Sequence, residues 1–211
     1  MPVQQVQLIF SCLALILCTI CCGCSHELSR ALPPRYSSQA GETAVSQYDT
    51  NRDGALGGTE LDAVPALKSS LDAIDTDGNG QLTAAEINAR VKQWLSFRIA
   101  EMPVRCEVLW NNEPLENAQV VFDPEPFLGA DVHAAQGIST ASGTAGISMA
   151  KAYLADERYA GVACGWYKIR VTSTTVEIPA RYNTETTLGC EVSMNADWVN
   201  HGAVQLQLQN R

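Results

Sequence analysis

Two twelve-residue segments, Asp49-Thr-Asn-Arg-Asp-Gly-Ala-Leu-Gly-Gly-Thr-Glu60 and Asp75-Thr-Asp-Gly-Asn-Gly-Gln-Leu-Thr-Ala-Ala-Glu86, repeat one pattern of oxygen-bearing side chains. Calcium accepts about six to eight oxygen ligands at roughly 2.3 to 2.6 Å, and a loop of this length supplies them from its first, third, fifth, seventh and twelfth positions. The sixth position turns with positive φ, and both segments have there a glycine, which adopts that conformation without steric cost. The stretch from Asp49 to Glu86 therefore predicts two calcium-binding loops.

The ligands of each loop follow from this spacing. The first loop offers the side chains of Asp49, Asn51, Asp53 and Glu60 and the backbone carbonyl of Ala55. The second loop offers the side chains of Asp75, Asp77, Asn79 and Glu86 and the backbone carbonyl of Gln81. At the ninth position we expect a water beside Gly57, which has no side chain, whereas Thr83 has a hydroxyl group. The sequence thus predicts two Ca²⁺ sites; the alternative is a pair of Asp- and Gly-rich turns without metal.

Residues 40 to 100 resemble an EF-hand pair on these two loops. The resemblance implies a small all-α domain, placed at residues 40–102, in which the leucine at the eighth position of each loop packs against the other. Short helices are expected between the loops, one of them beginning at Pro65, because proline suits a first helical turn. Thr83 and Glu86 match a capping box, and the apolar spacing after them predicts the longest helix of the chain, up to Met102.

Residues 1–24 have the composition of an export signal, with an apolar run that leads into Cys21-Cys22-Gly23-Cys24. They resemble a bacterial lipoprotein signal, which implies acylation of Cys24 and a membrane-anchored protein of the cell envelope, on its periplasmic or cell-surface side. A cleaved signal without lipid and an uncleaved anchor are the alternatives. Residues 25–39 contain Pro33-Pro34 and several serines, and are expected to form a flexible tether.

From Val104 onward apolar and polar residues alternate, as is typical of half-buried strands. Strands are predicted at roughly 104–110, 118–123, 135–140, 145–150, 165–172, 188–194 and 203–209. The stretches 111–122, 165–171 and 178–183 resemble carboxypeptidase regulatory-like or transthyretin-like modules, which implies an antiparallel β-sandwich at residues 103–211. The predicted fold class is α+β with two domains, a small all-α EF-hand pair followed by an antiparallel β-sandwich.

Composition and motifs exclude several classes of function. The net charge of −9 argues against a nucleic-acid partner, which requires a basic surface. The sequence has no nucleophile elbow, zinc-protease motif or phosphate-binding loop, so an enzyme is not expected. Asp123 and Glu125, beside Pro124 and Pro126, are expected to be solvated.

The sequence therefore predicts an exported calcium-binding protein in which calcium mainly stabilises the EF-hand domain. Chelation is expected to melt residues 40–100 while residues 103–211 stay folded. One alternative is an accessory module that binds a polysaccharide or an envelope protein through Trp166, Tyr167 or Trp198, and another is a calcium-dependent switch. Export would permit one disulfide among Cys106, Cys164 and Cys190, and Cys106 with Cys190 is the favoured pair because both lie in predicted strands.

Overall fold

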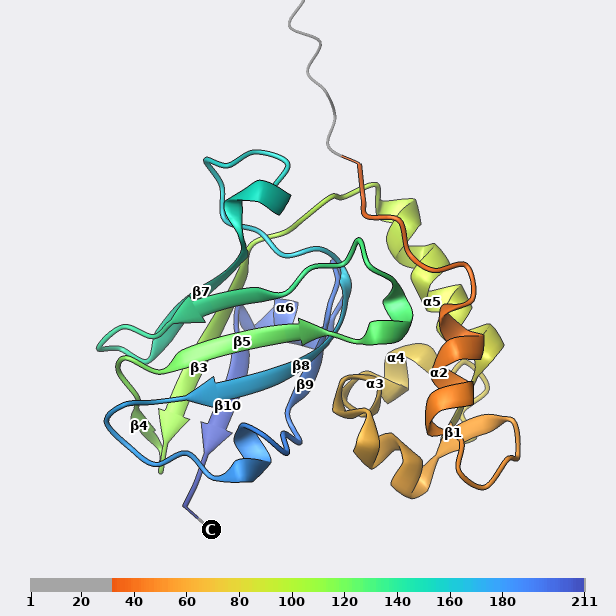
Figure 1. Cartoon of the computed structure of the whole chain (residues 1–211), viewed down its shortest axis with the longest axis horizontal. Coiled ribbons are helices and arrows are strands. Elements are labelled where there is room, and N and C mark those ends of the chain that lie inside the picture. Colours follow the sequence, from red (N-terminus) through yellow and green to blue (C-terminus); the bar gives the residue numbers. More distant parts are fainter. Residues whose placement is uncertain (1–31, 211) are drawn as a thin grey trace, which may run out of the picture. The chain divides into compact units, whose positions relative to one another are not determined.

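The computed structural model describes residues 32–210, and the contacts of Ala31–Arg211 make them one compact unit (Figure 1). The predicted leader at 1–24 and its acylation site Cys24 lie outside the described residues. Of the predicted tether at 25–39, Tyr36 is tied to the fold, because its hydroxyl donates to the carbonyl of Cys164 at 2.8 Å. The ring of Tyr36 also lies 5.6 Å, between centroids, from the ring of Trp94.

Short helices occupy the first half of the described chain. They are α2 (Ala40–Tyr48), η1 (Gly58–Ala63), α3 (Pro65–Ser69), α4 (Leu71–Ile74) and α5 (Ala84–Phe97), with α6 (Asp197–His201) and the single turns η2 (Pro126–Leu128), η3 (Lys151–Tyr153) and η4 (Ala180–Tyr182) later. The predicted helix start at Pro65 is confirmed. The helix after the second loop ends at Phe97, where the cap residue Arg98 turns with φ 54°, and so it stops before Met102. Between residues 32 and 210, no helix has the length and apolar character needed to cross a membrane.

The strands lie close to their predicted positions. They are β1 (Ala55–Gly57), β2 (Gln81–Thr83), β3 (Val104–Trp110), β4 (Glu113–Pro114), β5 (Gln119–Pro124), β6 (Ala135–Ile138), β7 (Thr144–Met149), β8 (Gly165–Thr172), β9 (Gly189–Val192) and β10 (Val204–Leu208). β1 and β2 form a small ladder, and the other strands form one sheet in the order β10-β3-β7-β6-β5-β8-β9, with β4 beside β3. Neighbours are antiparallel except β10 and β3, which are parallel.

The predicted fold class is wrong, because the chain is mostly β and its helices form no separate all-α domain. The short pairing of Ala135 with Met149 and Gln136 with Ser148 joins β6 to β7. This pairing makes the sheet continuous, so the predicted β-sandwich is present as one sandwich-like sheet and not as two separate sheets. The helices lie beside the same sheet (Figure 1).

The helices and the sheet share one hydrophobic core. Trp94 of α5 is buried against Trp166 of β8, with ring centroids 4.3 Å apart. Helix α3 lies directly on β9, because a Cβ atom at Gly189 would come within 2.3 Å of the backbone nitrogen of Ala66. The apolar stripe of α5, predicted to be the core of a helical pair, is thus packed on the sheet, which explains why no separate helical domain exists.

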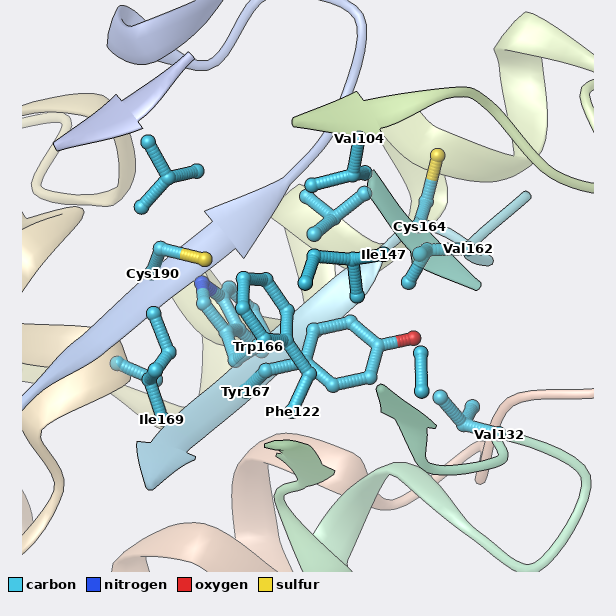
Figure 2. Packing of buried hydrophobic residues seen from close by; sticks show 14 of the residues in the cluster. Val104, Phe122, Val132, Ile147, Val162, Cys164, Trp166, Tyr167, Ile169 and Cys190 are labelled. Carbon is cyan, nitrogen blue, oxygen red and sulfur yellow. The ribbon is translucent and has the colours of Figure 1, made fainter. Parts of the chain in front are cut away.

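Aromatic and aliphatic side chains fill the space inside the curve of the sheet. Figure 2 shows the rings of Phe122 and Tyr167 side by side, with Ile147 and Val104 above them; the two ring centroids are 5.9 Å apart. Cys106, Cys164 and Cys190 are free, buried thiols, so the hypothetical pair of Cys106 with Cys190 is not present in this structure. Burial raises the pKa of each thiol, which disfavours the reactive thiolate.

Candidate metal centre

The ladder of β1 and β2 holds the two predicted loops together. Leu56 pairs with Leu82 in this ladder, and both side chains are fully buried. The expected contact between the leucines at the eighth positions is therefore confirmed. Because each leucine lies in the middle of its strand, the ladder fixes the second half of each loop against its partner.

The turn at the sixth position is also as predicted. Gly54 has φ 91° and Gly80 has φ 80°. A Cβ atom at either residue would have no neighbour within 4 Å. The backbone conformation, and not a lack of space, therefore accounts for glycine at both positions.

The second loop gathers three carboxylates. One oxygen each of Asp75, Asp77 and Glu86 lies within 4.8 Å of the others. Oxygens bound to one calcium ion at roughly 2.3 to 2.6 Å are at most about 5 Å apart, so this spacing fits a single ion. Asn79 Oδ1 is turned towards the backbone of the loop and accepts from Gln81 N at 2.7 Å.

The first loop repeats the same backbone contacts, but its carboxylates are not gathered into a group of three. Asp49 Oδ2 accepts from Gly54 N at 2.9 Å, as Asp75 Oδ2 accepts from Gly80 N at 2.7 Å. The third ligand position is Asn51, whose amide donates to Asp53 Oδ2 at 3.0 Å. Within residues 32–210, the triad of the second loop is the one group of at least three His, Cys, Asp or Glu side chains with metal-site spacing.

The glutamate at the twelfth position closes each loop. Glu60 Oε1 accepts from the backbone and side chain of Thr50 at 2.8 and 3.0 Å, and its Oε2 accepts from Gly57 N at 3.1 Å. Glu86 makes the equivalent contacts with Thr76 and, through Oε2, with Thr83 N at 2.9 Å. Glu86 N donates to the hydroxyl of Thr83, so the predicted capping box at the start of α5 is confirmed.

Backbone donors keep these carboxylates ionised. A hydrogen bond from Gly57 is the largest cause that lowers the pKa of Glu60, and one from Gly80 is the largest that lowers the pKa of Asp75. Burial raises the pKa of Glu86, but the donors of Thr83 and Thr76 together outweigh it and leave that pKa below its usual value. Anionic oxygens with lowered pKa values are the ligands that a hard divalent cation requires.

A buried acid that the sequence did not indicate lies beside the first loop. Glu125, expected in a solvated turn, is 1% exposed, and neither of its oxygens has a hydrogen-bond partner among residues 32–210. Lys168 Nζ is 3.8 Å from Oε2, and Glu125 acts on Tyr48, the residue before Asp49, whose pKa is raised to about 12 by burial and then by this carboxylate. The prolines on either side gave no signal of burial, because the covering side chains come from distant parts of the chain.

Glu125 makes the stability of the fold depend on pH. Burial raises its pKa from 4.5 to about 7, against the opposing effect of Lys168. The folded state therefore holds this proton more tightly than the unfolded state, so stability is lost as pH rises from 4.5 to about 7. We expect Glu125→Gln to stabilise the protein at pH 8 by on the order of 2 to 3 kcal/mol, and to have little effect near pH 4.5.

Urea denaturation of both proteins at the two pH values measures this difference. Glu116→Gln, at an exposed site, is the matched control and should change stability little at either pH. An equal effect of Glu125→Gln at both pH values would contradict a pKa raised by burial.

The two loops are the part of the described chain with the most specific geometry for a ligand. Each combines a glycine of positive φ, an aspartate that accepts from that glycine and a glutamate that closes the loop. Comparisons with protein-family models, with curated proteins and with solved structures found no match to this chain.

Proposed function

We propose that this protein binds calcium at the two loops, residues 49–60 and 75–86, and that the bound ions stabilise the fold. The observation that carries the proposal is the convergence of Asp75, Asp77 and Glu86 to within 4.8 Å in a loop whose backbone contacts the other loop repeats. A chance cluster of surface acids has no reason to recur with the same backbone donors. The pairing of Leu56 with Leu82 joins the two loops into one structural unit, which further supports the proposal.

The residues of each loop suit a hard cation. Asp75, Asp77, Asn79 and Glu86 offer side-chain oxygens in the second loop, and Gln81 offers its backbone carbonyl. Asp49, Asn51, Asp53, Glu60 and the carbonyl of Ala55 are their counterparts in the first. A bound ion would offset the repulsion among the carboxylates of its loop.

The position of the second loop supports a structural role for the ion. Glu86 is both the twelfth residue of the loop and the third residue of α5, and α5 extends into the shared core through Trp94. Sensor loops expose a methionine-rich groove when calcium binds, but no methionine lies between Asp49 and Glu86. The burial of Trp166 and Tyr167 also weighs against the accessory binding module, which needs exposed aromatic side chains.

Calorimetry tests the proposal on the purified protein. We expect two ions per chain, with dissociation constants up to about 10⁻⁴ to 10⁻³ M if the loops behave like extracellular modules. Glu86→Gln should weaken binding at the second loop more than at the first, because a bidentate contact loses its charge, and Glu60→Gln should do the reverse. Glu116→Gln, outside both loops, is the control and should leave both sites unchanged.

Two results would contradict the proposal. The first is less than one ion per chain at millimolar calcium. The second is calcium binding that survives in the double variant Glu60→Gln with Glu86→Gln, since such binding would come from other acidic groups.

A further inference from the structure

A cavity of about 340 Å³ lies between the α3–α4 junction and β9, α6 and β10. Its walls include Ser70, Asp72, Cys190, Trp198 and Val204. Sites for small molecules have volumes of roughly 300 to 1,000 Å³, so this cavity has the size for a small ligand. None of the side-chain ligands assigned to the calcium loops lines it.

The charged groups around the cavity are all acidic. Asp72, Glu191 and Asp197 line it, and no Lys, Arg or His does. Glu191 is neutralised by Arg90, at 2.8 Å. Asp72 has no salt bridge within residues 32–210, and Asp197, whose side chain is 96% exposed, has the imidazole of His201 at 4.0 Å. Two carboxylates at the rim are thus left without a Lys or Arg partner, which favours a cationic ligand.

The inner walls are suited to an apolar body. The indole of Trp198 is held in place because its Nε1 donates to the carbonyl of Glu191 at 2.8 Å. Cys190 and Val204 are buried beside it. The hydroxyl of Ser70, also buried, donates to the Ala66 carbonyl at 2.8 Å, and its oxygen keeps the capacity to accept a hydrogen bond. An aromatic face next to carboxylates binds organic ammonium ions through cation–π and ionic contacts.

We infer that this cavity binds a small organic ammonium ion whose apolar part lies against Trp198, with its charge between Asp72 and Asp197. The ammonium group has the hydrogen-bond donors that the carboxylates and the hydroxyl of Ser70 accept. The apolar part takes the place of water against Trp198, Cys190 and Val204. An anion of the same size would meet two unpaired carboxylates and is excluded.

Three probes of one shape test this inference: benzylamine, benzyl alcohol and benzoate, which are cationic, neutral and anionic at neutral pH. Titration of the full chain at saturating calcium, followed by the indole N–H signal of Trp198 in NMR spectra, locates the binding. Trp198→Phe assigns that signal. We expect benzylamine to shift it with saturation at millimolar concentration, benzyl alcohol to bind more weakly and benzoate not to bind.

Substitutions of single carboxylates test the contribution of charge to binding. Asp72→Asn and Asp197→Asn should each weaken benzylamine about fivefold, the effect of one carboxylate about 4 Å from the ligand charge in water. Asp131→Asn, the same change at an exposed site away from the cavity, should leave the affinity unchanged. Equal binding of benzylamine and benzyl alcohol, or no shift of the Trp198 signal, would overturn the inference. Calcium binding that survives in the Glu60→Gln, Glu86→Gln variant, with benzylamine binding retained, would contradict the proposed function alone.

Discussion

Chelation of calcium is expected to lower the stability of the helices and the sheet together, in one unfolding transition. A separate helical domain would melt alone, as the sequence suggested. The structure corrects that expectation, because the helices and the sheet bury their apolar side chains in one core. Trp94, carried by the helix that begins after the second loop, is packed against Trp166 of the sheet, so neither can lose its contacts without exposing the other.

The size of the effect follows from mass action. An ion that binds only the folded state adds about 2.7 kcal/mol at a hundredfold excess over its dissociation constant, so two sites add about 5 kcal/mol. This is a large part of the stability of a typical domain, which is about 5 to 15 kcal/mol. We therefore expect a fall in melting temperature that is readily measured on addition of a chelator.

Thermal unfolding with calcium and with a chelator measures this fall, followed by circular dichroism and by tryptophan fluorescence. The two signals should give the same midpoint, because one reports the helices and strands and the other the shared core. The double variant Glu60→Gln with Glu86→Gln should show no response to calcium. Two separate transitions would contradict a single unit. Unchanged melting with a new dye-binding surface would favour the calcium-dependent switch instead.

Local structure could be predicted from the sequence to a large extent. The alternation of apolar and polar residues predicted the bounds of the strands to within a few residues, because this alternation depends only on neighbours in the chain. The turns at Gly54 and Gly80 and the capping box of Thr83 with Glu86 were predicted for the same reason. Each of these features is decided by interactions within about a dozen residues.

Contacts between distant segments could not be predicted in this way. Alternation in a strand does not reveal its neighbours, so the parallel pairing of β10 with β3 and the junction of β6 with β7 gave no signal. The apolar stripe of α5 is also compatible with packing against either another helix or a sheet, so the sequence pattern does not distinguish the two. Glu125 is the clearest case at the candidate site. A charged residue between prolines is expected to be exposed, and only the folded structure brings the distant residues Tyr48 and Lys168 to its carboxylate.

One buried ion pair joins the helix after the second loop to the sheet. Its loss is expected to destabilise the protein strongly. Arg90 and Glu191 are 5% and 4% exposed, and Arg90 Nη2 lies 2.8 Å from Glu191 Oε1. The same oxygen accepts from Trp94 Nε1 at 2.7 Å. Arg90 also donates to the side-chain oxygens of Gln93 and Asn195. The carboxylate of Glu191 therefore depends on α5 for its partners.

Replacing Arg90 by methionine should destabilise the protein by about 3 to 5 kcal/mol, because it leaves the charge of Glu191 buried with one donor. Lys92→Met, on the exposed face of the same helix, is the matched control and should cost less than about 1 kcal/mol. Urea denaturation of both variants measures the difference. Adding Glu191→Leu to Arg90→Met should recover part of the loss, because removal of both partners leaves no buried charge. If Arg90→Met destabilises the protein no more than Lys92→Met, the ion pair does not stabilise the packing of α5 on the sheet. The packing of Trp94 on Trp166 would then be the contact that holds α5 in place.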